Sequence, residues 1–261
     1  MLKGKCLVVI GGTTGMGLSA AQAFVRNGAK VVVVGRSEAS CQSAAAMLGK
    51  SGKAQPGDAT EEGVAEAAIE LCLKTFKGFD GLYHVAGGSG RKFGDGPLHE
   101  MTLEGWNATL QMNLTSQMLS DRAAVRTFLE RGTKGAILNI GSILGAYPSP
   151  HFFTTHAYAA AKSAVIGFTR SLAAYYAPHN IRVNALVPAL VDTPMSQRAM
   201  GNDVIQDFIA TKQPLDGGRA GVPEDLDAAA VFFLSDASGF VTGQILSVDG
   251  GWSVTEGQIP K

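Results

Sequence analysis

The chain has 261 residues with 22 basic and 22 acidic side chains, so its formal net charge at pH 7 is zero. This balance gives no electrostatic argument for binding nucleic acid or an anionic membrane surface. Its length and a hydrophobic content of 46% allow one large α/β domain or two smaller ones. Because no linker, charge run or low-complexity tract divides the chain, we expect a single domain over residues 1–261.

The apolar segments and the cysteines point to a cytoplasmic protein. No segment reaches the roughly 20 apolar residues that a membrane-spanning helix needs. The first apolar run, Cys6 to Ile10, is too short for the core of a signal peptide. Cys6, Cys41 and Cys72 are widely spaced and show no metal-ligand pattern, so we expect no metal site.

In chain order, short β-branched runs alternate with longer helical patterns, which is typical of a parallel sheet with helices on both faces. Right-handed crossovers would give a Rossmann-like doubly wound sheet of about seven strands, with a ligand crevice at the carboxyl ends of the strands. The expected strands are Leu7–Ile10, Lys30–Val34, a weak one at Lys53–Pro56, Gly81–His84, Ala136–Ile140, Ile181–Leu186 and Ile245–Val248.

A glycine-rich turn follows the first expected strand and leads into a helical pattern. Its glycines are Gly11, Gly15 and Gly17, a spacing that differs from the common GxGxxG fingerprint. Such glycines let the backbone approach a pyrophosphate, while the next helix offers unpaired N–H groups and the positive end of its dipole. A tight turn without a ligand is the alternative, but the position after the first strand favours a dinucleotide site.

Tyr158 and Lys162 lie one helical turn apart in an Ala-rich run, so both side chains leave the same face of the expected helix. A nearby ammonium favours the phenolate, and the pair therefore predicts a tyrosine whose pKa is lowered. Lowering it by roughly 3 units would take about 4 kcal/mol. One lysine rarely supplies that, so a second positive charge, such as an oxidised nicotinamide, would help. The same spacing also occurs on helices as a surface pair without a role.

With both features in hand, the chain resembles the short-chain dehydrogenase/reductase family over nearly its full length. Further matches follow in the order of that family. They are Asp58, Asn113 in Gln111-Met112-Asn113-Leu114, Ser142 in Asn139-Ile140-Gly141-Ser142, Arg182-Val183-Asn184-Ala185, Pro188, Thr193-Pro194, and Val241-Thr242-Gly243-Gln244 before Val248-Asp249-Gly250-Gly251.

The resemblance implies hydride transfer between a nicotinamide cofactor and a carbonyl or alcohol carbon. Tyr158 would donate a proton to the developing alkoxide, and Ser142 would hydrogen-bond the substrate oxygen. Lys162 would lower the phenol pKa and hold the nicotinamide ribose, while Asn113 would anchor a water that relays protons. Each also has a structural alternative: Ser142 as a turn residue, and Asn113 as a helix-kink or capping residue.

Cofactor choice depends on the end of the second strand. Gly35 stands where the family's NAD-binding members place an acidic residue, and Arg36 and Ser37 could contact a 2′-phosphate. We therefore favour NADP(H), with NAD(H) possible, because Arg36 could instead stack on adenine or be solvated, and Thr14 is not basic. The resemblance places the cofactor against Gly11, Thr13, Thr14, Gly15, Met16, Gly17, Arg36, Ser37, Asp58, Ala59, Ala86, Gly87, Tyr158, Lys162, Pro188, Val191 and Thr193.

Substrate contacts are expected from the long segment at about 189–222, which we interpret as a substrate loop or lid with a short helix at Asp203–Thr211. Its apolar residues, with Phe152 and Phe153, fit an apolar pocket and, equally well, simple core packing or a subunit contact. Arg91 and Lys92 fit a solvated loop pair better than an anion contact. His84 replaces an asparagine common in relatives, and we interpret it as a packed strand residue.

The leading hypothesis is an NADP-dependent carbonyl reductase or alcohol dehydrogenase acting on a small molecule. Alternatives are an NAD-dependent alcohol or sugar dehydrogenase, an enoyl reductase, and a regulator that binds the cofactor without turnover. Relatives of the enoyl reductase type generally have additional residues between the tyrosine and the lysine. The resemblance also implies a homotetramer, for which small residues such as Ala160 and Gly167 would permit close helix contact.

Overall fold

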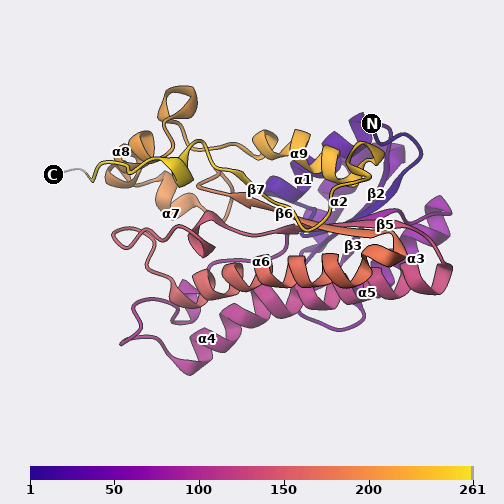
Figure 1. Ribbon diagram of the computed structural model, residues 1–261, viewed down its shortest axis with the longest axis horizontal. Helices are drawn as coiled ribbons and strands as arrows, with labels where there is room; N and C mark the ends of the chain where they lie inside the picture. The colour runs from indigo at the N-terminus through magenta and orange to yellow at the C-terminus, as the bar shows by residue number, and fades with distance from the viewer. Residues whose placement is uncertain (260–261) are drawn as a thin grey trace.

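The computed structural model describes residues 1–259, and a parallel sheet forms the centre of this part of the chain (Figure 1). Its seven strands lie in the order β3-β2-β1-β4-β5-β6-β7, and every neighbouring pair is parallel. The strands are β1 (Cys6–Ile10), β2 (Lys30–Gly35), β3 (Gly52–Pro56), β4 (Gly81–His84), β5 (Gly135–Ile140), β6 (Ile181–Pro188) and β7 (Ile245–Val248). The expected Rossmann-like doubly wound sheet is confirmed.

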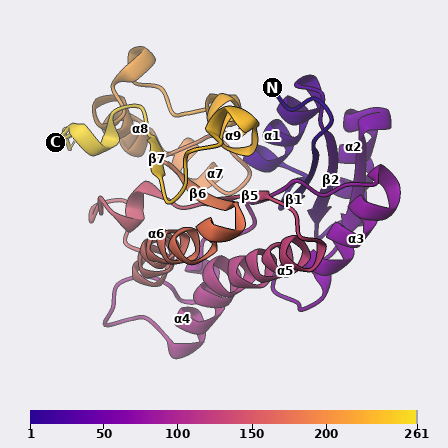
Figure 2. The same ribbon diagram turned by 45° about the vertical axis from the view of Figure 1, so that its right-hand side comes forward.

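Helices cover both faces of the sheet (Figures 1 and 2). One face is covered by α1 (Gly15–Arg26), α2 (Glu38–Leu48) and α9 (Asp227–Leu234). The opposite face is covered by α3 (Val64–Phe76), α5 (Ser116–Arg131) and α6 (His156–Tyr176). The helix α4 (Leu103–Leu110) precedes a π-helical segment, Gln111–Thr115, that leads into α5. None of the helices within residues 1–259 has the length and apolarity that crossing a bilayer requires.

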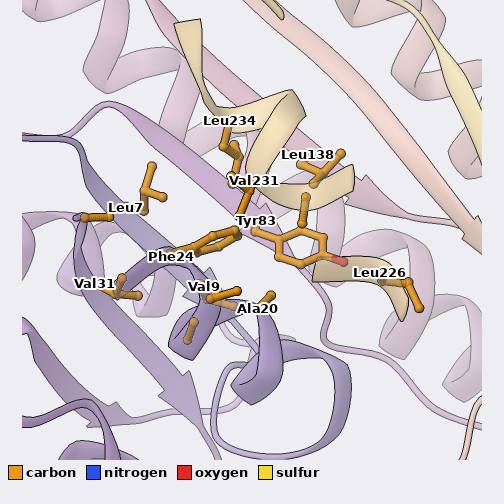
Figure 3. Close-up of a cluster of buried hydrophobic side chains, with 14 of the residues drawn as sticks. Leu7, Val9, Ala20, Phe24, Val31, Tyr83, Leu138, Leu226, Val231 and Leu234 are labelled. Atoms are coloured by element: carbon orange, nitrogen blue, oxygen red, sulfur yellow. The ribbon is translucent and has the colours of Figure 1, made fainter. Parts of the chain in front are cut away.

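Two cores, one on each face, hold the sheet between its helices. On the first, the rings of Phe24 and Tyr83 lie 6.2 Å apart among aliphatic side chains (Figure 3). On the second, Phe79 and Phe128 stack at 4.7 Å. Each large side chain buried in this way contributes about 1.5 to 3 kcal/mol. Cys6, the first residue of β1, is a core residue of the second face.

Five strands extend beyond their predicted bounds, and β1, β3 and β5 each begin one residue earlier than expected. The strand β6 continues through Pro188, which pairs with Val248, and β2 includes Gly35, which pairs with Pro56. The polar strand β3 lies at the edge of the sheet, which explains its weak apolar pattern. Because all strands are parallel, the loops that follow β1, β4, β5 and β6 begin at the same edge of the sheet, the one formed by the carboxyl ends of the strands.

The segment 189–222 folds onto this edge and contains α7 (Gln197–Met200) and α8 (Asp203–Lys212). The helix α8 begins at the predicted residue, where the Asn202 side chain accepts a hydrogen bond from the Ile205 N–H at 3.0 Å. Its apolar side forms a third core with Trp252 and Ile143. In Figure 1, α7 and α8 lie with the C-terminus at one end of the sheet.

Candidate active site

The glycine turn after β1 is built for close approach of backbone to backbone. Gly11 has φ of +84°, and a Cβ there would lie 2.6 Å from the backbone nitrogen of Ala86. A Cβ at Gly17 would overlap the carbonyl oxygen of Gly11. Thr14, the N-cap of α1, makes no side-chain capping bond, and the first turn has no acidic residue. The N–H groups and dipole of α1 are thus available to an anion, and the turn fits the pyrophosphate of a dinucleotide.

At the end of β2, Gly35 packs directly against Thr13. A Cβ at position 35 would overlap the Thr13 hydroxyl, so this backbone arrangement has no room for an acidic side chain there. The Ser40 hydroxyl donates to that of Thr13 at 3.2 Å, and Ser37 caps α2 by accepting from the Ser40 N–H at 3.4 Å. The Arg36 side chain next to them is exposed.

Asp58 follows β3 and accepts hydrogen bonds from the backbone N–H and the hydroxyl of Thr60, at 2.9 and 2.8 Å. Burial alone would raise the pKa of Asp58, but these bonds and the positive charge of Arg36 lower it below its ordinary value. Asp58 is therefore an ionised acceptor beside Arg36, at the same edge of the sheet.

Asn113 lies in the π-helical segment and is fully buried. Its amide nitrogen donates to the carbonyl oxygens of Gly88 and Thr109, both at 2.9 Å, and its amide oxygen accepts from the Gly88 N–H at 3.1 Å. A Cβ at Gly87 would lie 2.7 Å from the Asn113 oxygen and 3.6 Å from Nζ of Lys162. The Asn113 side chain thus ties the loop after β4 to this helix, close to Lys162.

Ser142 and Tyr158 line one cavity, although 16 positions separate them in sequence. Ser142 lies two residues after the end of β5 and caps a short 3₁₀ turn, accepting from the Leu144 N–H at 3.3 Å. Tyr158 lies in the first turn of α6. Burial raises the pKa of Tyr158, and the Ser142 hydroxyl lowers it by less.

In this structure Lys162 alone does not lower the pKa of Tyr158. The Lys162 Nζ donates to the carbonyl oxygen of Ile140 at 2.9 Å and lies 5.8 Å from the centre of the Tyr158 ring. Burial lowers the pKa of Lys162 itself to about 8, from an ordinary value of 10.5. The shared helical face was predicted correctly, but burial, and not the charge of Lys162, sets the direction of the Tyr158 pKa.

The first turn of α6 is held by Asp95, a residue that the sequence analysis missed. Its two carboxylate oxygens accept from the backbone N–H groups of Ala157 and Tyr158, each at 3.0 Å, and the side chain is 3% exposed. Asp95 lies 61 positions before the helix that it caps, so no local capping pattern reveals it.

His84 is a packed strand residue. Its ring nitrogens lie 3.1 Å from the Ser120 hydroxyl and 3.4 Å from the Ser116 hydroxyl, both on α5. Burial and the charge of Lys162 lower the pKa of His84 to about 3, so the ring is neutral.

The cavity beside Ser142 and Tyr158 has mostly apolar walls. Phe153 and Met195 line it, as do residues that the sequence analysis did not single out, including Trp252 and Arg198. Phe208 instead packs in the third core, with its ring 5.0 Å from that of Phe152. Pocket wall and core packing therefore each describe some of these apolar residues.

The remaining expected cofactor contacts lie at the same edge of the sheet. A Cβ at Gly15 would lie 3.4 Å from the methyl group of Thr193. Val191 is buried and pairs with Gly221 in an isolated parallel bridge. Met16 lies in the first turn of α1, Ala59 and Ala86 follow β3 and β4, and Pro188 ends β6. Within residues 1–259, no three His, Cys, Asp or Glu side chains cluster as metal ligands.

Comparisons with known proteins agree with this geometry. A family model described as enoyl-(acyl carrier protein) reductase matches residues 11–253. The 2,5-dichloro-2,5-cyclohexadiene-1,4-diol dehydrogenase of Sphingobium indicum is 37% identical over 253 residues, which cover 97% of this chain and 98% of that protein.

Two solved structures are similar over almost the whole chain. A short-chain type dehydrogenase/reductase from Mycobacterium ulcerans superposes with a TM-score of 0.89 at 29% identity, covering 98% of this chain and 92% of that one. A 3-ketoacyl-(acyl-carrier-protein) reductase from Brucella melitensis, complexed with NADH, has a TM-score of 0.85 at 31% identity and covers 97% and 100% of the two chains. This protein therefore belongs to the short-chain dehydrogenase/reductase family of oxidoreductases.

Proposed function

We propose that the protein interconverts a small-molecule carbonyl and the corresponding secondary alcohol, with NADP(H) as the cofactor. The observation that carries the proposal is the cavity in which Ser142 and Tyr158 meet, beside the buried Lys162 and at the same edge of the sheet as the glycine turn. When bound, the dihydronicotinamide would supply a hydride to the carbonyl carbon.

The chain's own residues would supply the proton and the positioning. The Ser142 hydroxyl donates a hydrogen bond to the substrate oxygen, and the Tyr158 hydroxyl gives its proton to the same oxygen as negative charge develops. A raised pKa suits Tyr158 to the protonated form that this donation requires. In the oxidative direction the phenolate takes the proton back. Because both amide hydrogens of Asn113 are used in bonds to the backbone, its contribution would be to hold the loop beside Lys162.

The cofactor would lie along the edge formed by the glycine turn and the loops after β4 and β6. Arg36 supports NADP(H), because it is exposed directly after β2, where the adenosine ribose would lie, and Gly35 leaves no room for a repelling carboxylate. Asp58 would accept from the adenine amino group and Thr193 would bind the nicotinamide carboxamide. The similarity to an NADH complex from Brucella melitensis keeps NAD(H) as the competing choice.

We favour carbonyl reduction over enoyl reduction, although the matching family model is described as an enoyl reductase. A hydroxyl donor pair, Ser142 and Tyr158, is what a developing alkoxide needs. Only three residues separate Tyr158 from Lys162, without the additional residues expected of enoyl reductases. A regulator without turnover has no need for this pair in a cavity.

The test is the rate of NADPH and NADH oxidation over a panel of ketones, oxoacyl thioesters and sugars. The Tyr158→Phe variant is compared with Tyr147→Phe, which removes the hydroxyl of an exposed tyrosine outside the cavity. We expect Tyr158→Phe to lose roughly 100-fold or more in kcat while still binding NADPH in a fluorescence titration. Full activity of Tyr158→Phe would contradict the proposal, and NADPH binding without turnover on any substrate would favour the regulator.

For the whole chain, we propose one dinucleotide-binding and catalytic domain over residues 1–261, a substrate lid at about 189–222, and a cytoplasmic homotetramer. Ala160, Ser163 and Gly167 are exposed along one side of α6 and support close contact with a second helix. A mass near four chains by light scattering is expected, and a monomer would contradict this part of the proposal.

A further inference from the structure

Two arginine side chains from distant segments meet at the wall of the cavity. Arg91 lies on the loop after β4, and Arg198 lies on α7. The Nη2 atoms of both donate to the same carbonyl oxygen, that of Phe152, at 3.4 and 3.0 Å. Two positive groups on one oxygen must lie close together. Both side chains also line the cavity that Ser142 and Tyr158 share.

The positive charge of this pair is not neutralised by the described part of the chain. Neither arginine is among the nine side-chain ion pairs formed within residues 1–259. The carboxylate of Asp95 is near enough to raise the pKa of Arg91, but both its oxygens already bind the first turn of α6. Burial, and then the charge of Arg198, lower the pKa of Arg91. Both side chains are exposed, so water screens part of their repulsion, and a bound anion would remove what is left.

Much of the remaining cavity wall is apolar. Arg198 lies 5.9 Å from the centre of the Phe153 ring, and Phe153, Leu144 and Met195 are part of the wall. The cavity therefore combines hydrogen-bond donors for a carbonyl oxygen, apolar wall and two cationic groups. A small molecule with a carbonyl, a short hydrocarbon chain and a terminal anion matches these three parts.

We propose that Arg91 and Arg198 together bind a terminal oxoanion of the substrate, of which a carboxylate is the simplest case. Guanidinium groups bind such anions through paired, charge-assisted hydrogen bonds. The inference rests on the proposed function for the reaction itself and adds the substrate class: oxo acids or hydroxy acids in preference to neutral ketones.

The activity test uses oxo acids of graded chain length, each paired with its methyl ester. The ratio of kcat/KM for acid to ester is measured in the natural chain and in Arg198→Gln, Arg91→Gln and Lys92→Gln. The exposed Lys92 is the matched control, because it adjoins Arg91 in sequence but does not line the cavity. At one chain length the acid should be preferred by roughly tenfold or more, and each arginine variant should lower this ratio roughly tenfold. The ratio should be unchanged in Lys92→Gln.

A binding test separates this inference from the proposed function. The chain has two tryptophans, so Trp106→Phe leaves Trp252, which lines the cavity, as the only fluorescent indole. Titration with simple monocarboxylates and dicarboxylates should change its emission, with an affinity that both arginine variants weaken and Lys92→Gln does not. If esters are reduced but acids are not preferred, the oxoanion site is wrong and the reductase stands. If no substrate is reduced but carboxylates bind through the arginines, the oxoanion site stands and the proposed reductase function is wrong. Carboxylate binding that is equal in all variants would overturn the inference.

Discussion

The capping of α6 by Asp95 leads to a prediction about both stability and rate. Asp95→Ala removes the acceptors of two backbone N–H groups in the helix turn that contains Tyr158. Hydrogen bonds to a charged group contribute about 1.5 to 3 kcal/mol each, and the loss of a negative charge at a helix N-terminus costs about 0.3 to 1 kcal/mol. Because water can reach part of the freed turn, we expect the free energy of unfolding to fall by about 2 to 4 kcal/mol.

An Asp95→Asn variant makes the prediction quantitative. Its amide has one oxygen, so it can accept from only one of the two N–H groups and presents a donor to the other. We expect about half the loss of Asp95→Ala in urea unfolding. Both variants should also lower kcat, because the backbone of Tyr158 is no longer fixed.

Asp80→Ala is the matched control, because Asp80 accepts from the Cys6 N–H at 2.8 Å at the start of β1, the opposite edge of the sheet. It should destabilise the fold without changing kcat. A stability of Asp95→Ala within about 0.5 kcal/mol of the natural chain, or equal kcat losses in Asp95→Ala and Asp80→Ala, would refute the reasoning.

Three further predictions follow from the site. Between pH 8 and 10.5 the folded chain releases the Lys162 proton that the unfolded chain keeps. The free energy of unfolding should therefore rise with pH relative to that of Lys162→Met, by up to about 3 kcal/mol at 1.36 kcal/mol per pKa unit. A difference between the two proteins that stays constant in urea unfolding across this pH range would contradict the prediction. Gly17→Ala should abolish NADPH binding in a titration, because its Cβ would overlap the Gly11 carbonyl, whereas Gly96→Ala, with open space around it, should bind NADPH normally. Arg36→Ala should raise the KM for NADPH roughly tenfold and leave that for NADH unchanged; equal changes for both cofactors would exclude a 2′-phosphate contact.

The sheet could be predicted because each strand is recognisable from the residues within it and directly beside it. Runs such as Lys30–Val34 are continuous and β-branched, and a glycine turn or polar loop marks each end. The ends themselves depend on partners: Pro188 belongs to β6 only because Val248 lies beside it. That pairing joins residues 60 positions apart, which no local pattern can show.

For the candidate site, the sequence indicated which residues lie together but not the directions in which their pKa values shift. Tyr158 and Lys162 were placed on one helical face correctly, yet their pKa directions depend on burial and on the carbonyl of Ile140. Asp95 and Arg198 were missed because each acts on a segment far away in sequence. Their partners, the first turn of α6 and the carbonyl of Phe152, become neighbours only in the folded chain.

The π-helical segment at Gln111–Thr115 amounts to one extra residue within an otherwise regular helix. Each residue turns an α-helix by about 100°, so deleting it would rotate everything that follows. Phe128 and Ala124, which pack on the sheet from α5, would then turn away from the core. The position of Asn113 is therefore tied to the burial of a whole helix. A variant of this chain without any need for Asn113 would still have to keep the extra residue of the π-helical segment in order to fold.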